Sequence, residues 1–430
     1  MWQLIMRRIF VILLFLYTGA LTQENSVKDF GYYWRQAQNT YKAKDYPAYL
    51  ENMKEVVKFR PDNPNMKYNL ACAQALAGST NDALAILNTL AEMGLVYDAA
   101  ADEDFSALKT SEAFQSLVEK FARNKTPVGR SEVAFKLPEK DLITESVAYD
   151  PKTAAFFVSS VHKRKIVRVD KTGACKDFVT SQAGLWSVLG MKVDATRGVL
   201  WTCSAVVPEM QGYKKEDDGR SGVYKFDLKT GRLIKSYLLS NQPQAHVFGD
   251  LTISAGGDVY ISDSVSPAIY CITRKKDELE LFLTSDLFRS PQGLTFSADE
   301  KHLFVADYSV GILKIDLPAK RAIKIAAPEN VAFTTVDGMY FYKNSLIAIQ
   351  NGINPHRVAR FFLNQNYDRI ERAGVVAANH PLFNEPTLGV LVRDTFYYIA
   401  NSQWGSFNQD KTIFPLEKLQ EPIVLKTELQ

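Results

Sequence analysis

One short phrase of residues recurs six times between about residue 145 and residue 400 of the chain. Each copy combines a small-residue or acidic start, an alternating apolar strand, a turn and a second apolar strand. The copies begin at residues 145–150, 189–194, 249–254, 292–297, 337–342 and 388–393. An all-strand repeat of roughly 40–50 residues is typical of β-propeller blades. The repeat therefore predicts an all-β, six-bladed propeller over residues 131–430.

Two segments of this β region depart from the simple repeat. The second blade is longer than the others, and its excess falls in residues 206–220. We interpret this excess as an exposed loop, and two roles stay open: a partial lid over one mouth of the channel, or a solvated loop with no part in the site. The strand-like residues 131–136 precede the first blade. They are expected to complete the last blade as its outer strand, which removes an exposed sheet edge.

The region before the propeller, residues 28–121, has a helical pattern. Two helix pairs superimpose with a shift of 34 residues, which is the length of a tetratricopeptide repeat. The matched positions are Trp34 with Tyr68, Ala37 with Ala71, Met53 with Leu87, and Val56 with Leu90. This region resembles a tetratricopeptide module, which implies either a docking surface for a protein partner or a helical extension packed on the propeller. Residues 122–130 form a polar linker containing Pro and Gly.

The N-terminal residues 1–22 have the features of a secretory signal peptide. Arg7 and Arg8 precede a short apolar run, and small residues such as Ala20 follow it. The run is shorter than the roughly 20 residues of a membrane span, so we expect no integral membrane span in the mature chain. An uncleaved N-terminal anchor is the alternative. The protein is therefore expected to be exported, to a periplasm or to the outside.

Composition excludes some classes of partner and leaves the cysteines unassigned to any site. The formal net charge is +3, and no run of Lys and Arg is interleaved with aromatic residues, so nucleic acid is not expected as a partner. The cysteines are Cys72, Cys175, Cys203 and Cys271. They form no C-x-x-C motif, which argues against zinc and against a redox centre. One disulfide is allowed in an oxidising compartment, but Cys203 and Cys271 lie on apolar strands and are expected to be buried thiols.

The first residues of the repeated phrases predict a site. Innermost strands of a propeller begin near the central axis, so these residues are expected to meet across the channel although about 40 residues separate them in sequence. Glu145, Gln292 and Asp337 open three phrases, and Asp250 lies one position later in another. Carboxylate and amide oxygens suit a hard divalent cation, most simply Ca²⁺. Water and hydrogen bonds filling an acidic channel are the alternative.

Further polar residues fall near the same strand ends. His246 precedes Asp250 by four residues and is a candidate proton shuttle. Glu385, His380, Asn351 and Asn401 are candidate rim residues, also at strand ends. No G-x-S-x-G motif and no phosphate-binding loop occurs, which argues against a serine hydrolase or a nucleotide enzyme.

The repeats resemble the superfamily of gluconolactonase, senescence marker protein (regucalcin) and luciferin-regenerating enzyme over residues 131–430. That family holds one divalent cation with a Glu, two Asn and an Asp. The resemblance implies that Glu145 and Asp337 are ligands, the latter within 336–339 (Val-Asp-Gly-Met). Gln292 stands where the family has one Asn, and Gly249 stands where it has the other. Asp250 follows that lost ligand and matches an Asp that the family places beside its substrate.

The resemblance implies a function, with one rival. We expect metal-assisted opening of a lactone or related ester, with Glu145, Gln292, Asp337 and Asp250 as candidate ligands and Asp250 or His246 handling the proton. The rival is a non-catalytic binding protein whose propeller recognises a small molecule or a partner.

Overall fold

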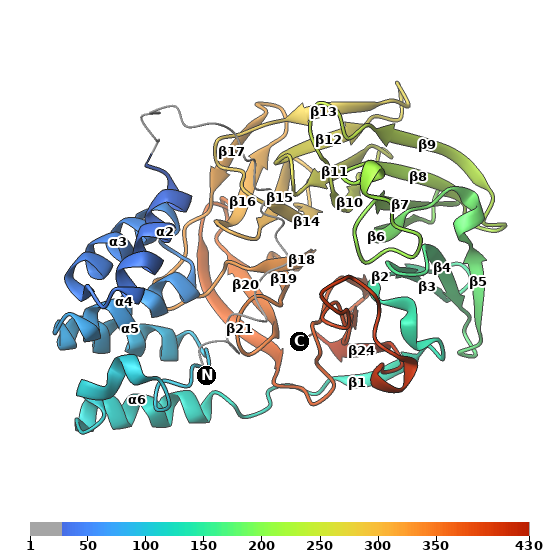
Figure 1. The fold of residues 1–430 in the computed structure, drawn as a ribbon. Helices are drawn as coiled ribbons and strands as arrows, with labels where there is room; N and C mark the ends of the chain where they lie inside the picture. Colours follow the sequence, from blue (N-terminus) through green and yellow to red (C-terminus); the bar gives the residue numbers. More distant parts are fainter. Residues whose placement is uncertain (1–27, 430) are drawn as a thin grey trace. The chain divides into compact units, whose positions relative to one another are not determined.

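The computed structural model describes residues 28–429, which fall into two compact units that divide between Asn124 and Lys125 (Figure 1). Each unit is described by itself. The predicted signal peptide, residues 1–22, lies outside the described residues. Within residues 28–429, no helix has the length and apolar character needed to cross a membrane.

The first unit is helical. Its elements are α2 (Phe30–Lys42), α3 (Tyr46–Phe59), α4 (Pro64–Leu76), α5 (Thr80–Glu92), the 3-10 helix η1 (Glu103–Leu108) and α6 (Glu112–Arg123). Short polar side chains begin several of these helices, since each accepts a hydrogen bond from an otherwise unpaired N–H of the first turn. Asp29, Asp45, Asn63 and Ser111 are the residues that do so.

The internal repeat predicted for this unit is present in the structure. Helix α4 begins 34 residues after α2, and α5 begins 34 residues after α3. Equivalent positions of the two helix pairs are buried, as a repeated packing pattern requires: Ala37, Met53 and Val56 in the first pair, and Ala71, Leu87 and Leu90 in the second. The assignment to the tetratricopeptide class stays a prediction.

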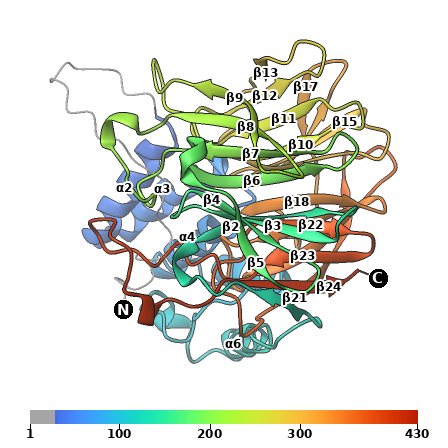
Figure 2. The same cartoon turned by 90° about the vertical axis from the view of Figure 1, so that its right-hand side faces the viewer.

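The second unit is a six-bladed propeller, and every blade is a four-stranded antiparallel sheet (Figures 1 and 2). Blades 1 to 3 comprise β2 (Thr144–Asp150), β3 (Ala155–Ser160), β4 (Lys165–Val169) and β5 (Cys175–Val179); β6 (Ser187–Asp194), β7 (Val199–Ala205), β8 (Ser221–Asp227) and β9 (Leu233–Leu239); and β10 (Phe248–Ile253), β11 (Val259–Asp263), β12 (Ala268–Ile272) and β13 (Leu279–Leu283). Blades 4 to 6 comprise β14 (Pro291–Phe296), β15 (His302–Asp307), β16 (Gly311–Asp316) and β17 (Arg321–Lys324); β18 (Val336–Tyr342), β19 (Ser345–Gln350), β20 (Arg357–Leu363) and β21 (Ile370–Ala378); and β22 (Gly389–Val392), β23 (Thr395–Ile399), β24 (Ile423–Glu428) and β1 (Glu132–Lys136). Four 3-10 turns occur in loops: η2 (Lys140–Leu142), η3 (Ser181–Ala183), η4 (Lys215–Asp217) and η5 (Leu416–Lys418).

Strand β1 closes the ring, which confirms the predicted role of residues 131–136. It pairs antiparallel with β24, with Glu132 opposite Lys426. Beside this pairing, the Ser131 hydroxyl lies 2.8 Å from the Tyr398 hydroxyl and 2.6 Å from that of Thr427. Closure leaves the last blade with the same four strands as the others.

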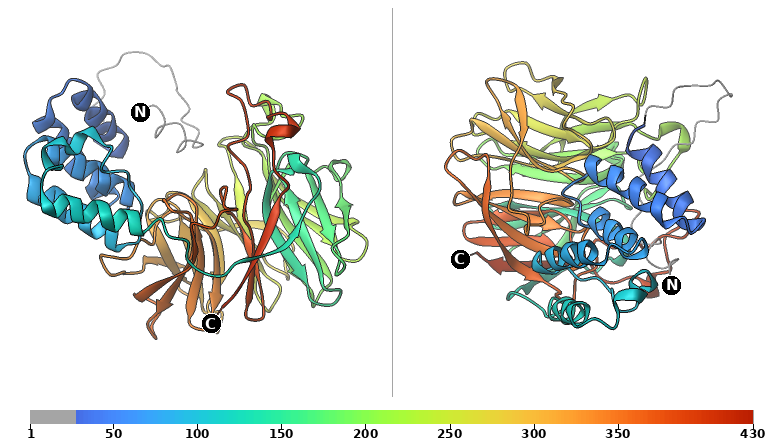
Figure 3. Two further views of the ribbon diagram at one scale, coloured as in Figure 1. Left: turned by 90° about the horizontal axis from the view of Figure 1, so that it is seen from below. Right: turned by 90° about the vertical axis from the view of Figure 1, so that its left-hand side faces the viewer.

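Two long connections leave the blades. The Glu209 loop, residues 206–220, joins β7 to β8 and contains η4, where the sequence predicts an exposed loop. The Trp404 loop, residues 400–422, joins β23 to β24 and contains η5. The left panel of Figure 3 shows the Trp404 loop, in dark red, extending out from its blade.

The innermost strands of five blades carry a β-bulge at the repeated phrase. In blade 1, for example, Glu145 and Ser146 lie between the paired residues Thr144 and Val147 and oppose the single residue Ser159. The equivalent irregularities lie in β6, β10, β14 and β18. A bulge re-aims the side chains of the strand that bears it. The predicted site residues Glu145, Asp250, Gln292 and Asp337 all lie in these bulges.

The glycine that follows the first residue in most phrases is explained by close packing of neighbouring bulges. A Cβ on Gly293 would lie 2.5 Å from the carbonyl oxygen of Asp337 and 2.6 Å from the amide nitrogen of Met339. Both obstacles are backbone atoms, which cannot rotate away. Glycine is therefore required at this position of blade 4.

We expect Gly293→Ala to destabilise the protein by about 1–3 kcal/mol, the usual cost of forcing atoms into a packed interior. The measurement is the free energy of unfolding in urea. Gly256→Ala is the matched control, because a Cβ there would meet its nearest neighbour, the Ser254 hydroxyl, at 3.5 Å. Equal stability of the two variants would contradict the packing argument.

The cysteines are unpaired, as expected for Cys203 and Cys271. All four cysteines are free thiols, and Cys72, Cys203 and Cys271 are buried. Burial raises the pKa of the Cys203 thiol well above its usual value, so it stays protonated and unreactive at neutral pH.

Candidate functional site

Four carboxylates from blades 1, 3, 5 and 6 face one another in the channel. We call Glu145, Asp250, Asp337 and Glu385 the acidic cluster. Burial, and then the charge of Asp337, raises the pKa of Glu145 well above its usual value. Burial, and then the charge of Asp250, raises the pKa of Asp337 to about 7. Burial likewise raises the pKa of Glu385 to about 7. These carboxyls therefore hold protons, or need a cation, near neutral pH.

Glu145 is held from blade 6. Its side chain is half-buried, and its Oε2 accepts a hydrogen bond of 2.8 Å from the indole Nε1–H of Trp404. Its backbone carbonyl accepts from the Leu388 amide at 3.0 Å and from the Thr387 hydroxyl at 2.8 Å. Both ends of the residue are thus fixed by the first strand and the long loop of the last blade.

Asp337 is held within its own blade. Its Oδ2 accepts a 2.9 Å hydrogen bond from Nδ2 of Asn351, at the end of β19. Asn351 in turn accepts from the hydroxyl of Tyr308 at 3.1 Å. Burial raises the pKa of Tyr308, and the charges of Asp337 and Glu385 raise it further, so the phenol remains a donor. The sequence-predicted rim residue Asn351 is therefore part of the site.

Gln292 fills the space left by Gly249. A Cβ on Gly249 would lie 3.2 Å from the side-chain oxygen Oε1 of Gln292. The amide nitrogen of Gln292 donates to the Ser290 hydroxyl at 3.1 Å, which leaves Oε1 as the acceptor end of the side chain. One longer amide side chain from blade 4 thus occupies the region where blade 3 has no side chain.

Asp250 forms a buried ion pair that the sequence did not predict. Its Oδ1 lies 3.0 Å from Nζ of Lys192, which comes from the phrase of blade 2. Asp250 is 1% exposed, and its Oδ2 is buried without any hydrogen-bond partner. Burial raises the pKa of Asp250, and Lys192 acts in the opposite direction. The ammonium group of Lys192 also lies 5.5 Å from the centre of the Tyr340 ring.

His246 is placed away from the acidic cluster. Its Nδ1 lies 2.5 Å from Oδ2 of Asp263, and its ring packs against Phe248 and Tyr270. The other oxygen of Asp263 accepts backbone amides of residues 247, 265 and 266. This network fixes the loop before β10. The structure therefore brings Glu145, Asp250 and Asp337 together, and it gives His246 a separate carboxylate partner.

Sequence reasoning missed two side chains that touch the acidic cluster, Lys192 and Trp404. Lys192 did carry a signal, because it is the one charged residue at the fourth position of the six phrases. Trp404 carried none, since it lies in an irregular loop rather than in a phrase. Its contact with Glu145 spans 259 residues of sequence.

Comparisons with known proteins report on the fold. No family model matches the chain, and no curated protein matches it. Among solved structures, a gluconolactonase from Xanthomonas campestris has 12% identity and a TM-score of 0.46, over 70% of this chain and 89% of that one. Luciferin-regenerating enzyme has 11% identity and a TM-score of 0.49, over 71% and 96%. A PQQ-bound aldose sugar dehydrogenase from Streptomyces coelicolor has 12% and 0.48, over 70% and 99%. These similarities concern the propeller alone and assign no activity.

The donor set of the channel fits a hard divalent cation. Glu145, Gln292 and Asp337 supply only oxygen atoms, which Ca²⁺ and Mg²⁺ prefer. Asp250, the fourth predicted ligand, already pairs with Lys192, so we place it outside the likeliest three-residue donor set on charge grounds. Within the described residues, one group of three His, Cys, Asp or Glu ligand atoms lies within 4.8 Å of one another: Cys72, Asp102 and Asp104 in the helical unit. A channel site would therefore need the Gln292 amide in addition to carboxylates.

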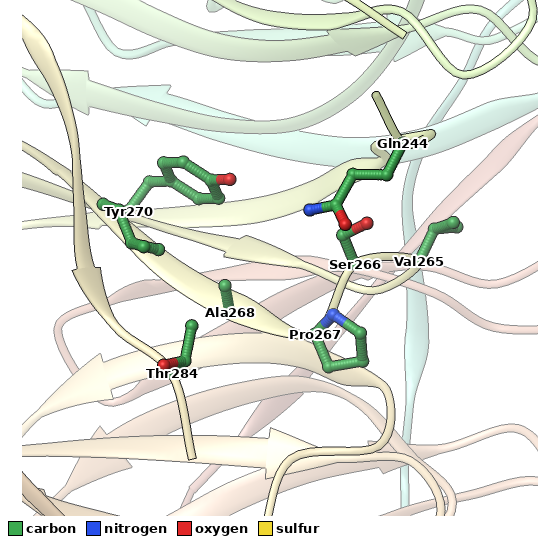
Figure 4. Close-up of a pocket in the computed structure, with 8 residues that line it drawn as sticks. Gln244, Val265, Ser266, Pro267, Ala268, Tyr270 and Thr284 are labelled. Carbon is green, nitrogen blue, oxygen red and sulfur yellow. The ribbon is translucent and has the colours of Figure 1, made fainter. Parts of the chain in front are cut away.

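A surface cavity of about 380 Å³ lies on blade 3, apart from the acidic cluster (Figure 4). Gln244, Ser266, Tyr270 and Thr284 supply its polar groups. Its lining contains no carboxylate, histidine, lysine or arginine. It therefore offers neither a base nor metal ligands, and the channel remains the candidate site.

Proposed function

We propose that the propeller binds a divalent cation, Ca²⁺ in the simplest case, and hydrolyses a lactone or related ester in its channel. The observation that carries the proposal is the convergence of Glu145, Gln292 and Asp337 from three bulges, beside a buried Asp250 with one unpartnered oxygen. The resemblance of the repeats to the gluconolactonase superfamily supports the same chemistry.

Glu145, Gln292 and Asp337 would hold the cation through their oxygens. When bound, a divalent cation supplies a Lewis acid that polarises a carbonyl and lowers the pKa of a water molecule. A cation also offsets the mutual repulsion that raises the pKa of Glu145 and Asp337.

Asp250 is the proposed general base. Its free Oδ2 can accept a proton, while Lys192 holds Oδ1 and favours the charged form of the carboxylate. Glu385, whose pKa burial raises to about 7, can return a proton to the departing alcohol at neutral pH. His246 has no part in this scheme, since Asp263 holds its ring.

The test is a screen of aliphatic, aryl and sugar lactones with the full chain after removal and readdition of Ca²⁺. We expect turnover that depends on the cation and falls at least 100-fold in Asp337→Asn and in Asp250→Asn, because each variant removes a group that acts on the reacting atoms. Asp299→Asn, an exposed Asp on blade 4, is the matched control. Cation-independent turnover, or full activity of Asp337→Asn, would refute the mechanism.

A binding protein without catalysis is the second candidate, and the Asp250–Lys192 ion pair favours it. A base already paired with an ammonium group is a weaker base, so the same channel could hold a cation and a ligand without turning the ligand over. Ligand-induced stabilisation with no turnover, retained in Asp250→Asn, would identify this function.

Export and a protein partner for the helical unit complete the proposal. Both rest on the sequence, through the features of residues 1–22 and the 34-residue repeat. N-terminal sequencing of the mature protein tests the first, and pull-down with residues 28–124 deleted or present tests the second.

A further inference from the structure

The Trp404 loop is rigidly anchored at its base. The side chain of Asn401 donates to the carbonyl of Glu421 at 3.0 Å and accepts from the amide of Ile423 at 2.7 Å. The side chain of Gln403 exchanges two hydrogen bonds with the backbone of Gln420, at 2.9 and 2.8 Å. These four bonds join the two ends of the loop, so the residue that follows Gln403 has a fixed position.

The outer part of the Trp404 loop is held by the Glu209 loop (Figure 3). Nζ of Lys411 lies 2.7 Å from Oε1 of Glu209, a carboxylate whose side chain is 3% exposed. His162 completes the contact, because its Nδ1 lies 2.7 Å from the Glu209 carbonyl and its ring lies 5.8 Å from that of Phe407. A buried ion pair of this kind fixes geometry more than it adds stability.

Trp404 projects from this frame onto Glu145. Its indole Nε1–H is the one hydrogen-bond donor to the Glu145 carboxylate among residues 28–429. The bond is made to Oε2, so Oε1 stays available to a cation or to water. Hydrogen bonds from outside a metal site orient its ligands, and their loss typically weakens metal binding 10–100-fold.

We propose that Trp404 is a positioning residue: it fixes the Glu145 carboxylate for cation binding, and the Lys411–Glu209 pair fixes the loop that carries it. The inference rests on the cation site of the proposed function. It adds that the ligand from blade 1 is oriented by the long loop of blade 6, so the site is incomplete until the Trp404 loop is in place.

The test pairs cation affinity with a double-mutant cycle on stability. Trp404→Phe keeps the aromatic ring and removes only the N–H donor. After dialysis against chelator, calcium chloride titration calorimetry of the full chain is expected to show affinity weakened about 10-fold or more in this variant. Trp186→Phe is the matched control, since Trp186 stacks near Tyr224 and Arg220 instead. Its affinity is expected to equal that of the unmodified protein.

The cycle combines Trp404→Phe with Glu145→Ala and measures urea unfolding without added cation. Directly contacting residues show non-additive effects, whereas a purely structural tryptophan has the same effect with or without Glu145. Additive effects, or unchanged calcium affinity in a Trp404→Phe variant of a protein that binds calcium, would overturn the inference. If the unmodified protein binds no calcium, the proposed function fails on its own, and the cycle alone decides whether Trp404 fixes Glu145.

Discussion

Lys192→Met is expected to destabilise the propeller by about 3–5 kcal/mol at pH 8, the usual effect of removing one partner of a buried ion pair. Asp250 would then be a carboxylate that is 1% exposed, with one oxygen already unpartnered and the other newly so. Lys192 itself is mostly buried, so solvent does not screen the pair. Urea unfolding of the full chain, followed by a propeller signal such as tryptophan fluorescence, measures the loss.

The pH dependence of this variant follows from the sign of the pKa shift. Burial raises the pKa of Asp250 even with Lys192 present, and removing Lys192 raises it further. The folded variant then binds a proton that the unfolded chain releases at lower pH, so its stability falls as pH rises. The deficit should therefore shrink at pH 5, where the carboxyl is protonated in the folded state.

Two controls separate charge from packing. Lys192→Met combined with Asp250→Asn removes both charges, so most of the lost stability should return. Lys301→Met removes a lysine whose side chain is 73% exposed and whose partner lies 3.8 Å away, and it should change stability little. If the double variant is no more stable than Lys192→Met, the buried charge is not the cause.

The acidic cluster predicts that the protein without cations is more stable at pH 5 than at pH 8. Glu145, Asp337 and Glu385 have raised pKa values, the last two about 7, against about 4 in an unfolded chain. Between these values the folded state binds more protons than the unfolded state. Stability therefore falls as pH rises through that window, by up to about 1.4 kcal/mol per pH unit for each carboxyl.

The measurement is the melting temperature of the full chain in chelator across pH 5–8, then with calcium chloride. We expect a fall of several degrees across the range, and recovery on adding calcium at pH 8, because a bound cation replaces the lost protons. The Glu145→Gln/Asp337→Asn variant should lose most of the pH dependence and the response to calcium. A flat profile in the unmodified protein, with no response to calcium, would mean that the carboxyls neither share protons nor bind a cation.

The fold followed from the sequence because its signal is periodic. Six phrases with small or acidic starts fixed the number of blades, and the strand at 131–136 fixed how the ring closes. The same periodicity placed Glu145, Gln292 and Asp337 near the axis, since equivalent positions of equivalent strands must lie at equivalent places. Burial of the cluster and the direction of its pKa shifts needed the structure.

The parts of the site that escaped prediction are those that do not repeat. Trp404 lies in a loop whose course depends on the Lys411–Glu209 pair and on bonds to residues 420–423. Lys192 reaches across to the next blade, a contact that no local pattern encodes. His246 was singled out by its distance in sequence from Asp250, but Asp263 lies opposite in the neighbouring strand and holds its ring. Proximity along the chain was a poor guide to proximity in the channel.

Pairing of β1 with β24 sets an order on events during synthesis. The first strand to emerge after the helical unit finds its partner only when residues 423–428, almost the last of the chain, have been made. The helical unit can fold while the ribosome is still at work, since its helices pack on near neighbours in sequence. The ring cannot. Until termination, β1 and the open edge of β23 remain unpaired, so a truncation of even the last ten residues should leave a chain prone to pair with other copies rather than a slightly smaller propeller.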